Sequence, residues 1–251
     1  MAKQSGLGDN FYVHGYDLSG DINSLGTISG GNAPFDVTGI DKSAYERIGG
    51  KRDGNIEFTS YFNPFTDRSH LRLSTLPTTD VHLYYARGTT LGNPAACMVG
   101  KQINYDGTRG DDGDFKFSVQ AQCNAFGLEW GRQMTAGKRT DTGAANGTSV
   151  DFTTGSTTFG LQAYLQVFSF TGTDVTVKLQ ESSDNGAGDA FADVTGGGFT
   201  QITSGPTVER IATASNQTVE RYLRVVTATT GGFSSLVFAV MVCRNDTATV
   251  F

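Results

Sequence analysis

The part of this chain that is richest in possible metal ligands is a short acidic run between two apolar stretches. From Asp106 to Asp114 the chain holds four aspartates among glycines. Carboxylate oxygens at such density are the hard ligands that Ca²⁺ prefers. The run lacks both the spacing of a helix-flanked calcium loop and the glutamate that closes one. We therefore expect a solvated hairpin turn, with a Ca²⁺ site as the open alternative.

Other residue types that carry chemistry are scattered. The histidines, His14, His70 and His82, have no metal-binding spacing and stand in no cluster with cysteine. No Gly-x-Ser-x-Gly turn is present to expose a nucleophilic serine. Two of the three cysteines, Cys123 and Cys243, fall in predicted strands, where we expect buried, small apolar side chains. The sequence thus predicts no catalytic residue, no metal ligand and no cofactor.

Composition excludes two classes of partner. The chain has 251 residues, a net charge of -6 and a pI near 5.0. A protein that coats nucleic acid needs clustered Lys and Arg to neutralise phosphates, and this balance argues against one. No apolar run approaches the roughly 20 residues of a membrane span. The first residues contain no apolar signal-peptide core, so we expect synthesis in the cytoplasm and no membrane partner.

The stretch from Asp53 to Arg87 organises the first half of the chain and reads as strand, short helix, strand. Polar and apolar side chains alternate with the period of a half-buried strand: Asn55, Glu57 and Thr59 against Ile56, Phe58 and Ser60. A second strand is predicted around Val81, Leu83 and Tyr85. One helix covers only one face of a largely antiparallel sheet, so the function of the protein must account for the other face.

The predicted helix lies between these two strands. Asn63 is a favourable N-cap, Pro64 suits the first helical position, and Leu76 before a proline marks the end. The side chains expected to face the core are Phe65, Leu71 and Leu73.

Two further features are predicted in the first half. Residues 41–48 are compatible with one helical turn that Gly49 and Gly50 stop, followed by a turn at residues 51–54. A long loop of mixed charge on a β scaffold is often an interaction element. Residues 95–105 and 114–124 read as a hairpin. Its second strand has an apolar face (Phe115, Phe117, Val119, Ala121) and a polar face (Lys116, Ser118, Gln120, Gln122).

The second half contains strand patterns only. The candidate strands are residues 149–152, 157–170, 174–181, 207–214, 218–229 and 233–244. Six strands with turn signals between them predict a β-sandwich, Ig-like or jelly-roll-like. A polar linker is predicted at residues 138–147. We therefore expect a mainly β protein with two domains: an antiparallel sandwich or barrel with one short helix at 1–147, and an all-β sandwich at 148–251.

Three sequence stretches resemble a known family. They are DLSGDINSLGTISGG at 17–31, FDVTGIDKSAYERIGGKRDGNIEFTSYFNP at 35–64, and the run Trp130-Gly131-Arg132-Gln133 followed by Thr140-Asp141-Thr142 and Val150-Asp151. Together they resemble the tail tube (major tail) proteins of long-tailed bacteriophages, of the type found in phages of actinobacteria. The resemblance spans about residues 9–155, and the C-terminal sandwich is similar to accessory domains on the tube exterior.

The resemblance implies a structural virion protein and no enzyme. Family members form hexameric rings whose strands join into one continuous β-barrel, and the rings stack into the tail tube. The partners implied are other copies of the chain, the tape measure protein and the tail-end proteins, with DNA passing through the lumen without specific binding. The location implied is the virion tail, assembled in the host cytoplasm.

The resemblance also assigns residues. A loop beside the channel strands contacts the adjacent ring, and the matching residues here are Asp41, Lys42, Glu46, Arg47, Lys51 and Arg52. The polar strand faces would line the lumen, through Asn55, Glu57, Thr59, Lys116, Ser118, Gln120 and Gln122.

Two other function classes remain open from the sequence. One is another virion β protein, such as a capsid decoration protein or a baseplate component, which would differ in the form of its assembly. The other is a carbohydrate-binding module, for which aromatic residues of the second half are available. Glycan binding by residues 148–251 would identify that class.

Overall fold

The computed structural model describes residues 5–249 and divides the chain into two compact units. Unit 1 combines the described residues up to Gly20 with His82–Cys97 and the chain from Trp130 onward, and unit 2 combines Asp21–Val81 with Met98–Glu129. The fold is mainly β with one short helix and antiparallel sheets, which confirms the predicted fold class. Over the described residues the strands do not close into a barrel, and no helix there has the length and apolar character to cross a membrane.

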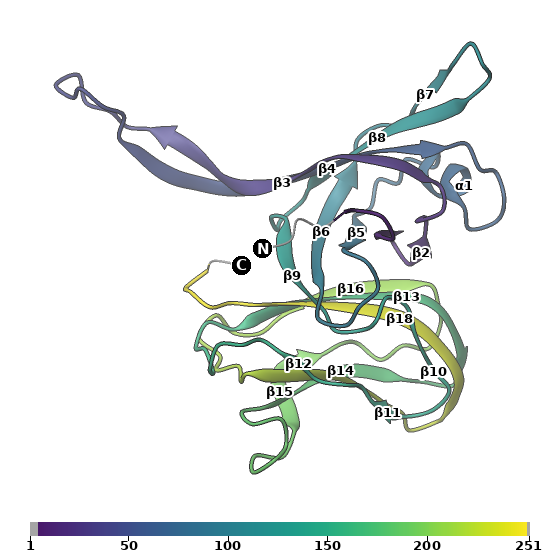
Figure 1. The fold of residues 1–251 in the computed structure, drawn as a ribbon, viewed down its shortest axis with the longest axis vertical. Coiled ribbons are helices and arrows are strands. Elements are labelled where there is room, and N and C mark those ends of the chain that lie inside the picture. Colours follow the sequence, from purple (N-terminus) through teal and green to yellow (C-terminus); the bar gives the residue numbers. More distant parts are fainter. Residues whose placement is uncertain (1–4, 250–251) are drawn as a thin grey trace. The chain divides into compact units, whose positions relative to one another are not determined.

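Unit 2 is built on an antiparallel sheet in the order β3-β4-β8-β7. The strands are β3 (Ile22–Asp36), β4 (Arg47–Tyr61), β7 (Asp106–Arg109) and β8 (Phe115–Cys123). The end of β6 (Pro94–Gln102) pairs with β8 beyond β7. Figure 1 shows β3 and β4 as one long twisted hairpin.

The alternation predicted for β4 is confirmed. Ile56 and Phe58 are buried, as is Ser60, while Asn55, Glu57 and Thr59 are partly buried and Tyr61 is exposed. On β8 the side chains of Phe117, Val119 and Ala121 are buried, but Phe115 is exposed, which corrects its predicted inward position. Phe115 lies at the end of β8 next to the turn, beyond the covered part of the sheet.

The helix α1 is much shorter than predicted and covers only Ser69–Leu73. Instead of capping a helix, Asn63 forms a turn through its Oδ1, which accepts from the Phe65 N–H at 3.2 Å. Asp67 and Leu76 both have positive φ (61° and 44°), which a continuing helix cannot contain. Phe65 and Leu71 are therefore exposed, and only Leu73 of the three expected core residues is buried.

Asp21 holds this segment against the sheet. One of its oxygens accepts from Asn63 Nδ2 at 2.7 Å, and the other accepts from the Ser69 N–H at 3.0 Å. The first N–H groups of a helix lack partners within the helix, so a carboxylate there stabilises the start of α1. Asp21 comes from a segment far away in sequence, and local sequence signals could not reveal it.

The predicted helical turn at 41–48 is wrong, and so is the turn at 51–54. Residues 37–46 form a loop, and Gly49 and Gly50 lie inside β4. A Cβ at Gly50 would overlap the Phe35 ring and the Ala33 carbonyl, so glycine lets the cross-strand aromatic ring lie over the backbone. Both glycines lie within the hairpin and do not end a helix, and Gly50 is the one that close approach requires.

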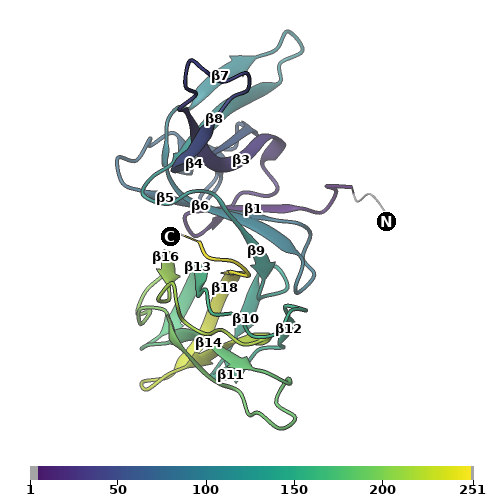
Figure 2. The same cartoon turned by 90° about the vertical axis from the view of Figure 1, so that its left-hand side faces the viewer.

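Unit 1 contains a β-sandwich (Figure 2). One sheet has the order β16-β13-β18, with β9 (Glu129–Gln133) and β10 also paired to β18. The other has the order β11-β17-β14-β15, with β12 paired to β17. The strands of the first sheet are β10 (Arg139–Asp141), β13 (Leu161–Gly172), β16 (Thr207–Ala212) and β18 (Phe233–Arg244). Those of the second are β11 (Ala145–Asn146), β12 (Val150–Asp151), β14 (Thr176–Ser182), β15 (Ala192–Gly198) and β17 (Tyr222–Ala228).

A single apolar core lies between these sheets, with Leu165 and Val240 from one and Leu179 and Val225 from the other. Strands predicted in the second half are confirmed at β13, β14, β16, β17 and β18, whereas β15 was missed because three of its seven residues are glycine. The predicted linker at 138–147 is wrong. Its residues supply β10 and β11 to the sandwich.

The short strands of unit 1 also include β1 (Asn10–Val13), β2 (Tyr16–Asp17) and β5 (Val81–Ala86), with β1 paired to both others. Buried Gln166 of β13 joins this group to the sandwich. Its Oε1 accepts from the Gly15 N–H at 2.6 Å, and its Nε2 donates to the His82 carbonyl at 3.1 Å. Both ends of a buried amide are thereby satisfied, which removes the cost of burying it.

Candidate functional site: a polar sheet face and a projecting arm

One face of the unit 2 sheet is polar across three strands. The register pairs Asn55 of β4 with Gln122 of β8, and Glu57 with Gln120. Directly opposed residues of an antiparallel pair point to the same face. The remaining predicted lumen residues follow the same register, since Thr59 is opposite Ser118 and Tyr61 is opposite Lys116. All seven residues assigned to a lumen therefore lie on one sheet face.

Strand β3 extends this polar face. Ser24 lies opposite Thr59 with the two hydroxyl oxygens 2.8 Å apart, and Thr27 donates to Glu57 Oε2 at 3.4 Å. Glu57 also accepts from Asn55 Nδ2 at 2.7 Å. These side chains bond to one another along and across strands, so the face is a layer of neutral amides and hydroxyls around a few charges.

The Lys116 cation on this face is paired, and Glu57 leaves the face slightly acidic. Lys116 forms an ion pair with Asp114, and this pairing raises the pKa of Lys116 and lowers that of Asp114. The Lys116 ammonium also lies 5.7 Å from the centroid of the Tyr61 ring. A face whose cation is already paired has little capacity to bind phosphate groups, because such binding depends on available Lys and Arg.

Two strands of the unit 2 sheet, β3 and β7, have a free edge in the described part of the chain, while the remainder of the β8 edge next to β7 is paired with β6. β3 pairs with β4 alone, and β7 pairs with β8 alone. An unpaired strand edge presents a row of N–H and C=O groups that can pair with another strand. The two edges lie on opposite sides of the same polar layer.

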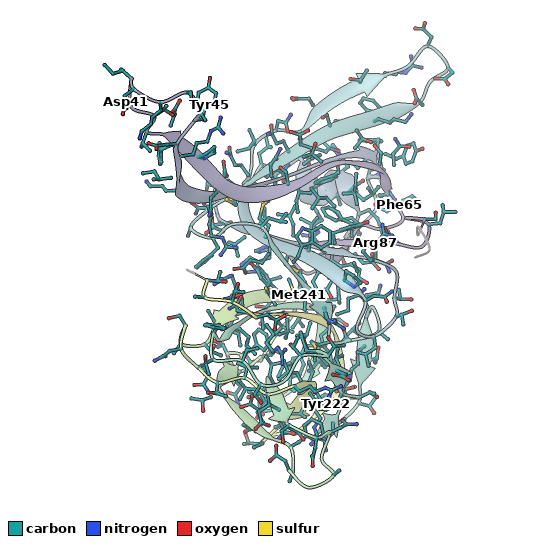
Figure 3. All side chains as sticks on the ribbon, turned by 60° about the vertical axis from the view of Figure 1, so that its left-hand side comes forward. Asp41, Tyr45, Phe65, Arg87, Tyr222 and Met241 are labelled. Atoms are coloured by element: carbon teal, nitrogen blue, oxygen red, sulfur yellow. The ribbon has the colours of Figure 1, made fainter. Side chains whose placement is uncertain are left out.

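The distal part of the β3–β4 hairpin forms a projecting arm, which we define as residues 31–53. None of its residues is buried (Figure 3). The apolar side chains of the arm are exposed as well, and Ile40 and Tyr45 at the tip are the most exposed of them. The others are Phe35, Val37 and Ile48. From the sequence, the charged residues of this segment were predicted as its contacts, and its apolar residues were not. The number of large apolar residues in so polar a loop was the signal for an apolar contact surface.

The structure separates the six residues assigned to ring stacking. Asp41, Lys42 and Glu46 lie in the tip loop, where Lys42 Nζ is 3.9 Å from an Asp41 oxygen and 3.7 Å from a Glu46 oxygen. Arg47 begins β4, and its guanidinium carbon lies 4.6 Å from the centroid of the Tyr45 ring. These four are available at the tip for an outside partner.

Lys51 and Arg52 lie nearer the base of the arm, and Arg52 has a role within the fold. Its Nη1 is 3.7 Å from Oε1 of the buried Glu129. Gly127 lies against Arg52, and Leu128 lies against Gly54, where a Cβ would be 2.7 Å from the Leu128 nitrogen. Arg52 and Leu128 therefore anchor the base of the arm to unit 2, and Arg52 is better described as an anchor than as a contact for a partner.

The acidic run at 106–114 forms the strand β7 and the turn that follows it. Asp106 lies in β7, and the turn is closed by the Gly110 N–H, which donates to the Asp114 carbonyl at 2.8 Å. Between residues 5 and 249 no group of three or more His, Cys, Asp or Glu side chains is arranged to hold a metal ion.

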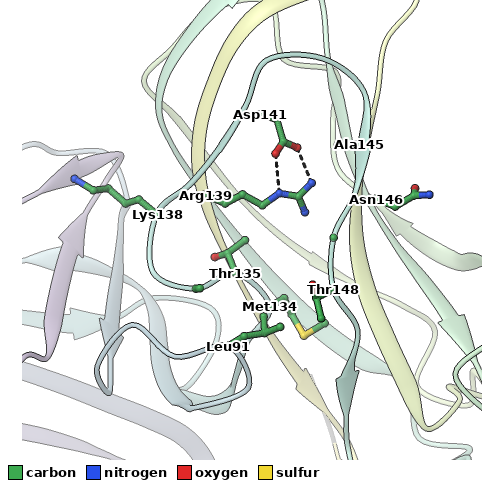
Figure 4. Close-up of a pocket in the computed structure, with 11 residues that line it drawn as sticks. Leu91, Met134, Thr135, Lys138, Arg139, Asp141, Ala145, Asn146 and Thr148 are labelled. Carbon is green, nitrogen blue, oxygen red and sulfur yellow. Dashed lines mark hydrogen bonds and ion pairs between the residues drawn. The ribbon is translucent and has the colours of Figure 1, made fainter.

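A cavity of about 470 Å³ lies in unit 1 beside β10 and β11 (Figure 4). Its polar wall is a closed set of interactions. Arg139 donates to both oxygens of Asp141 at 2.7 Å and to the Val225 carbonyl at 3.1 Å, and Asp141 accepts from Thr227 Oγ1 at 2.8 Å. This pair therefore holds β10 to β17. Lys138 also lines the cavity, and its amine is paired with Asp17.

No family model matches the sequence, and no curated protein matches it. Among solved structures, the chain is similar to the Dit (gp 19.1) protein of phage SPP1, described as a hub of the adsorption apparatus of phages that infect Gram-positive bacteria, with 15% identity and a TM-score of 0.31 over 92% of this chain and 98% of that one.

It is also similar to chains of the phage p2 baseplate in its activated conformation. The structure with Sr gives 9% identity and a TM-score of 0.31, and the structure with Ca gives 11% and 0.28, each over 95% of this chain and 99% of that one. These scores are too low to establish a common fold.

Proposed function

We propose that this chain is a structural protein of a phage tail whose copies close into rings and stack into the tail tube. The observation that carries the proposal is the β3-β4-β8-β7 sheet, which has one polar face, one buried face and two free edges. Joining the β3 edge of one copy to the β7 edge of the next makes a ring of strands without exposed edges.

In such a ring the polar layer lines the channel. The rows that contain Glu57 and Gln120, and Asn55 and Gln122, become bands of amides and carboxylates around the lumen. DNA passes such a wall without being held, because its few cations are paired and its carboxylates repel phosphate. Six copies per ring is the number that the resemblance to tail tube proteins implies.

The arm supplies the contact between stacked rings. Its tip residues Asp41, Lys42, Glu46 and Arg47 are exposed, as a contact outside the chain requires. In this proposal the sandwich, which was predicted as residues 148–251 and also includes β10 and β11, lies on the outside of the tube. The assembled protein resides in the virion tail, has no catalytic role, and meets the tape measure protein and the tail-end proteins there.

The experiment that tests ring closure uses the β7 edge. The Gly110 N–H donates to the Asp114 carbonyl, so these two opposed residues are a hydrogen-bonded pair. Hydrogen-bonded and non-hydrogen-bonded pairs alternate along an antiparallel ladder. The backbone of Thr108 therefore bonds to β8, while the Arg109 N–H points to the free edge. The variant Arg109→Pro removes that outward N–H and leaves the β7–β8 bonds in place. We expect the variant to fold with an unchanged circular dichroism spectrum and to form no rings in electron micrographs.

Arg109→Ala is the matched control, because it removes the same charge and keeps the N–H. It should form rings as the unaltered chain does. Rings formed equally by Arg109→Pro would contradict closure through this edge. Rings that form but never stack, in the unaltered chain, would favour the alternative of a hub or baseplate component over a tube.

A further inference from the structure

Exposed large apolar side chains are concentrated in unit 2. Among the described residues, unit 1 exposes two, Leu7 and Trp130, although it contains the larger core. All the others belong to unit 2, and they fall into two sets. The first set is the arm tip: Phe35, Val37, Ile40, Tyr45 and Ile48. The second surrounds α1 and the end of β8: Tyr61, Phe62, Phe65, Leu71, Leu76, Ile103 and Phe115.

The second set is ordered by ring contacts. The centroid of Phe62 lies 4.5 Å from that of His70 and 5.3 Å from that of Phe115. Beneath them the Phe117 and Tyr105 rings stack at 4.0 Å with an interplanar angle of 9°. Phe65 and Leu71 stand exposed on the adjoining segment. We call the exposed members Phe62, Phe65, Leu71 and Phe115 the aromatic patch.

The arm tip and the aromatic patch cannot meet within one chain. Ile48 and Tyr61 lie at opposite ends of β4, thirteen residues apart, which is about 40 Å of extended strand. Figure 3 shows the labelled Asp41 and Tyr45 at the arm tip and Phe65 at the far end of unit 2. A contact between them must therefore join two molecules head to tail.

The charges around the two surfaces are complementary. The tip carries three carboxylates, Asp36, Asp41 and Glu46, against Lys42 and Arg47. The segment of the patch from residue 61 to residue 76 carries Arg68 and Arg72 against Asp67. The turn beside Phe115 carries Asp111, Asp112 and Asp114 against Arg109 and Lys116, so the cationic side of the patch is the α1 segment with Phe65 and Leu71. A slightly acidic tip is complementary to that segment, whereas tip on tip would bring like charges together.

We propose that the aromatic patch is the receiving surface for the arm tip of a second copy of this chain, so that Ile40 and Tyr45 are buried against Phe62 and Phe65 of a neighbouring ring. The inference rests on the proposed function, since it identifies what the arm contacts. A contact between two different surfaces of one chain is heterologous, and it repeats without limit along a stack. The arm and the patch are thus the two halves of one stacking interface.

The test uses two variants, each lacking one half. Ile40→Asp with Tyr45→Asp removes the tip, and Phe65→Asp with Leu71→Asp removes the patch. All four side chains are exposed, so both variants should melt at the temperature of the unaltered chain. We expect each variant to form rings that do not stack, with the concentration needed for stacking raised about tenfold or more.

Mixing preformed rings of the two variants gives the decisive result. An intact tip of one ring can dock on an intact patch of the other, and no further ring can add at either end. We expect pairs of rings and nothing longer in sedimentation velocity and in electron micrographs. Leu7→Asp, which adds a carboxylate at an exposed apolar position of unit 1, is the control and should stack normally.

Each other outcome has a distinct meaning. Normal stacking by the patch variant, or single rings only in the mixture, overturns the assignment of the patch while ring formation and the proposed function stand. Failure of the unaltered chain to form rings at all overturns the proposed function, and this inference with it.

Discussion

Glu57 of β4 lies directly opposite Gln120 of β8, one position along from the opposed pair Ile56 and Ala121 on the other face of the sheet. Glu57 is partly accessible, whereas Ile56 and Ala121 are buried. The register therefore separates a polar layer from an apolar one across the whole sheet, and a slip by one residue would exchange them. Both the fold of unit 2 and the proposed channel lining depend on this register.

The buried side of that register is tested by Phe58→Asp. The Phe58 side chain is 3% exposed, and an aspartate there would bury an unpaired charge. We expect a loss of at least about 4 kcal/mol in the free energy of unfolding, which leaves no folded unit 2. Near-ultraviolet circular dichroism and solubility measure it. Phe35→Asp, at an exposed position of the arm, should stay folded, and a folded Phe58→Asp protein would mean that the assigned faces are wrong.

Sequence periodicity was sufficient for this sheet because its faces differ in polarity at every step. The alternation from Asn55 to Ser60 and from Lys116 to Gln122 predicted both faces correctly. The predicted limits of the helix α1 were wrong, because Asp21 and the positive φ of Asp67 and Leu76 determine where the helix begins and ends. A carboxylate supplied from a distant segment and a left-handed backbone leave no local signal of the kind that a cap or a proline gives.

Charge reversal at the arm tests stacking. Arg47→Glu with Lys51→Glu changes two exposed cations of the arm, so the fold should be unaffected. Because the reversal makes the arm more acidic against the cationic segment that receives it, we expect stacking to strengthen severalfold at low salt, and the difference from the unaltered chain to shrink at high salt, where the contact is screened. Light scattering against concentration measures it. Tubes that grow normally from this variant would exclude a role for these charges.

The arm also illustrates what the sequence could not reveal. Gly49 and Gly50 were interpreted as a helix stop, yet Gly50 serves the cross-strand packing of Phe35. The charges of the same segment do not act together, because Arg52 is turned toward Glu129 at the base while Lys42 and Glu46 lie at the tip. Which members of a charged segment are available to a partner follows from tertiary placement and not from spacing.

The pair Arg139–Asp141 is expected to be structural. Asp141→Ala would leave the largely buried guanidinium with the Val225 carbonyl as its remaining acceptor, and the Thr227 hydroxyl with the Ala145 carbonyl at 3.4 Å. We expect a loss of about 3 kcal/mol in the free energy of unfolding, measured by urea denaturation. Asp193→Ala breaks the exposed pair with Lys178 and should cost less than about 1 kcal/mol. Equal effects of the two substitutions would contradict the assignment.

Glu220 should make the stability of the protein depend on pH. Burial, a hydrogen bond to Asp189 and the neighbouring charges of Asp189, Glu181 and Asp184 raise its pKa from 4.5 to about 7. Because the folded pKa exceeds the unfolded one, the stability that this group contributes is complete below pH 4.5 and is lost as the pH rises through 7. We expect the melting temperature to fall between pH 5 and pH 8.

Glu220→Gln removes this titration and keeps the hydrogen bond to Asp189. The variant should show a flatter dependence on pH. The remaining slope combines two contributions of opposite sign, from Glu181, whose pKa burial raises, and from His14, whose pKa burial lowers. An unchanged slope in Glu220→Gln would assign the effect to other groups.

Electron microscopy of the purified chain over a range of concentrations tests the central claim most directly. Closure of the β3 and β7 edges around the polar layer predicts rings with a central hole, which join into tubes as the concentration rises. Particles that remain single chains at every concentration, with the free edges unpaired, would contradict the proposal that this sheet is one segment of a channel wall.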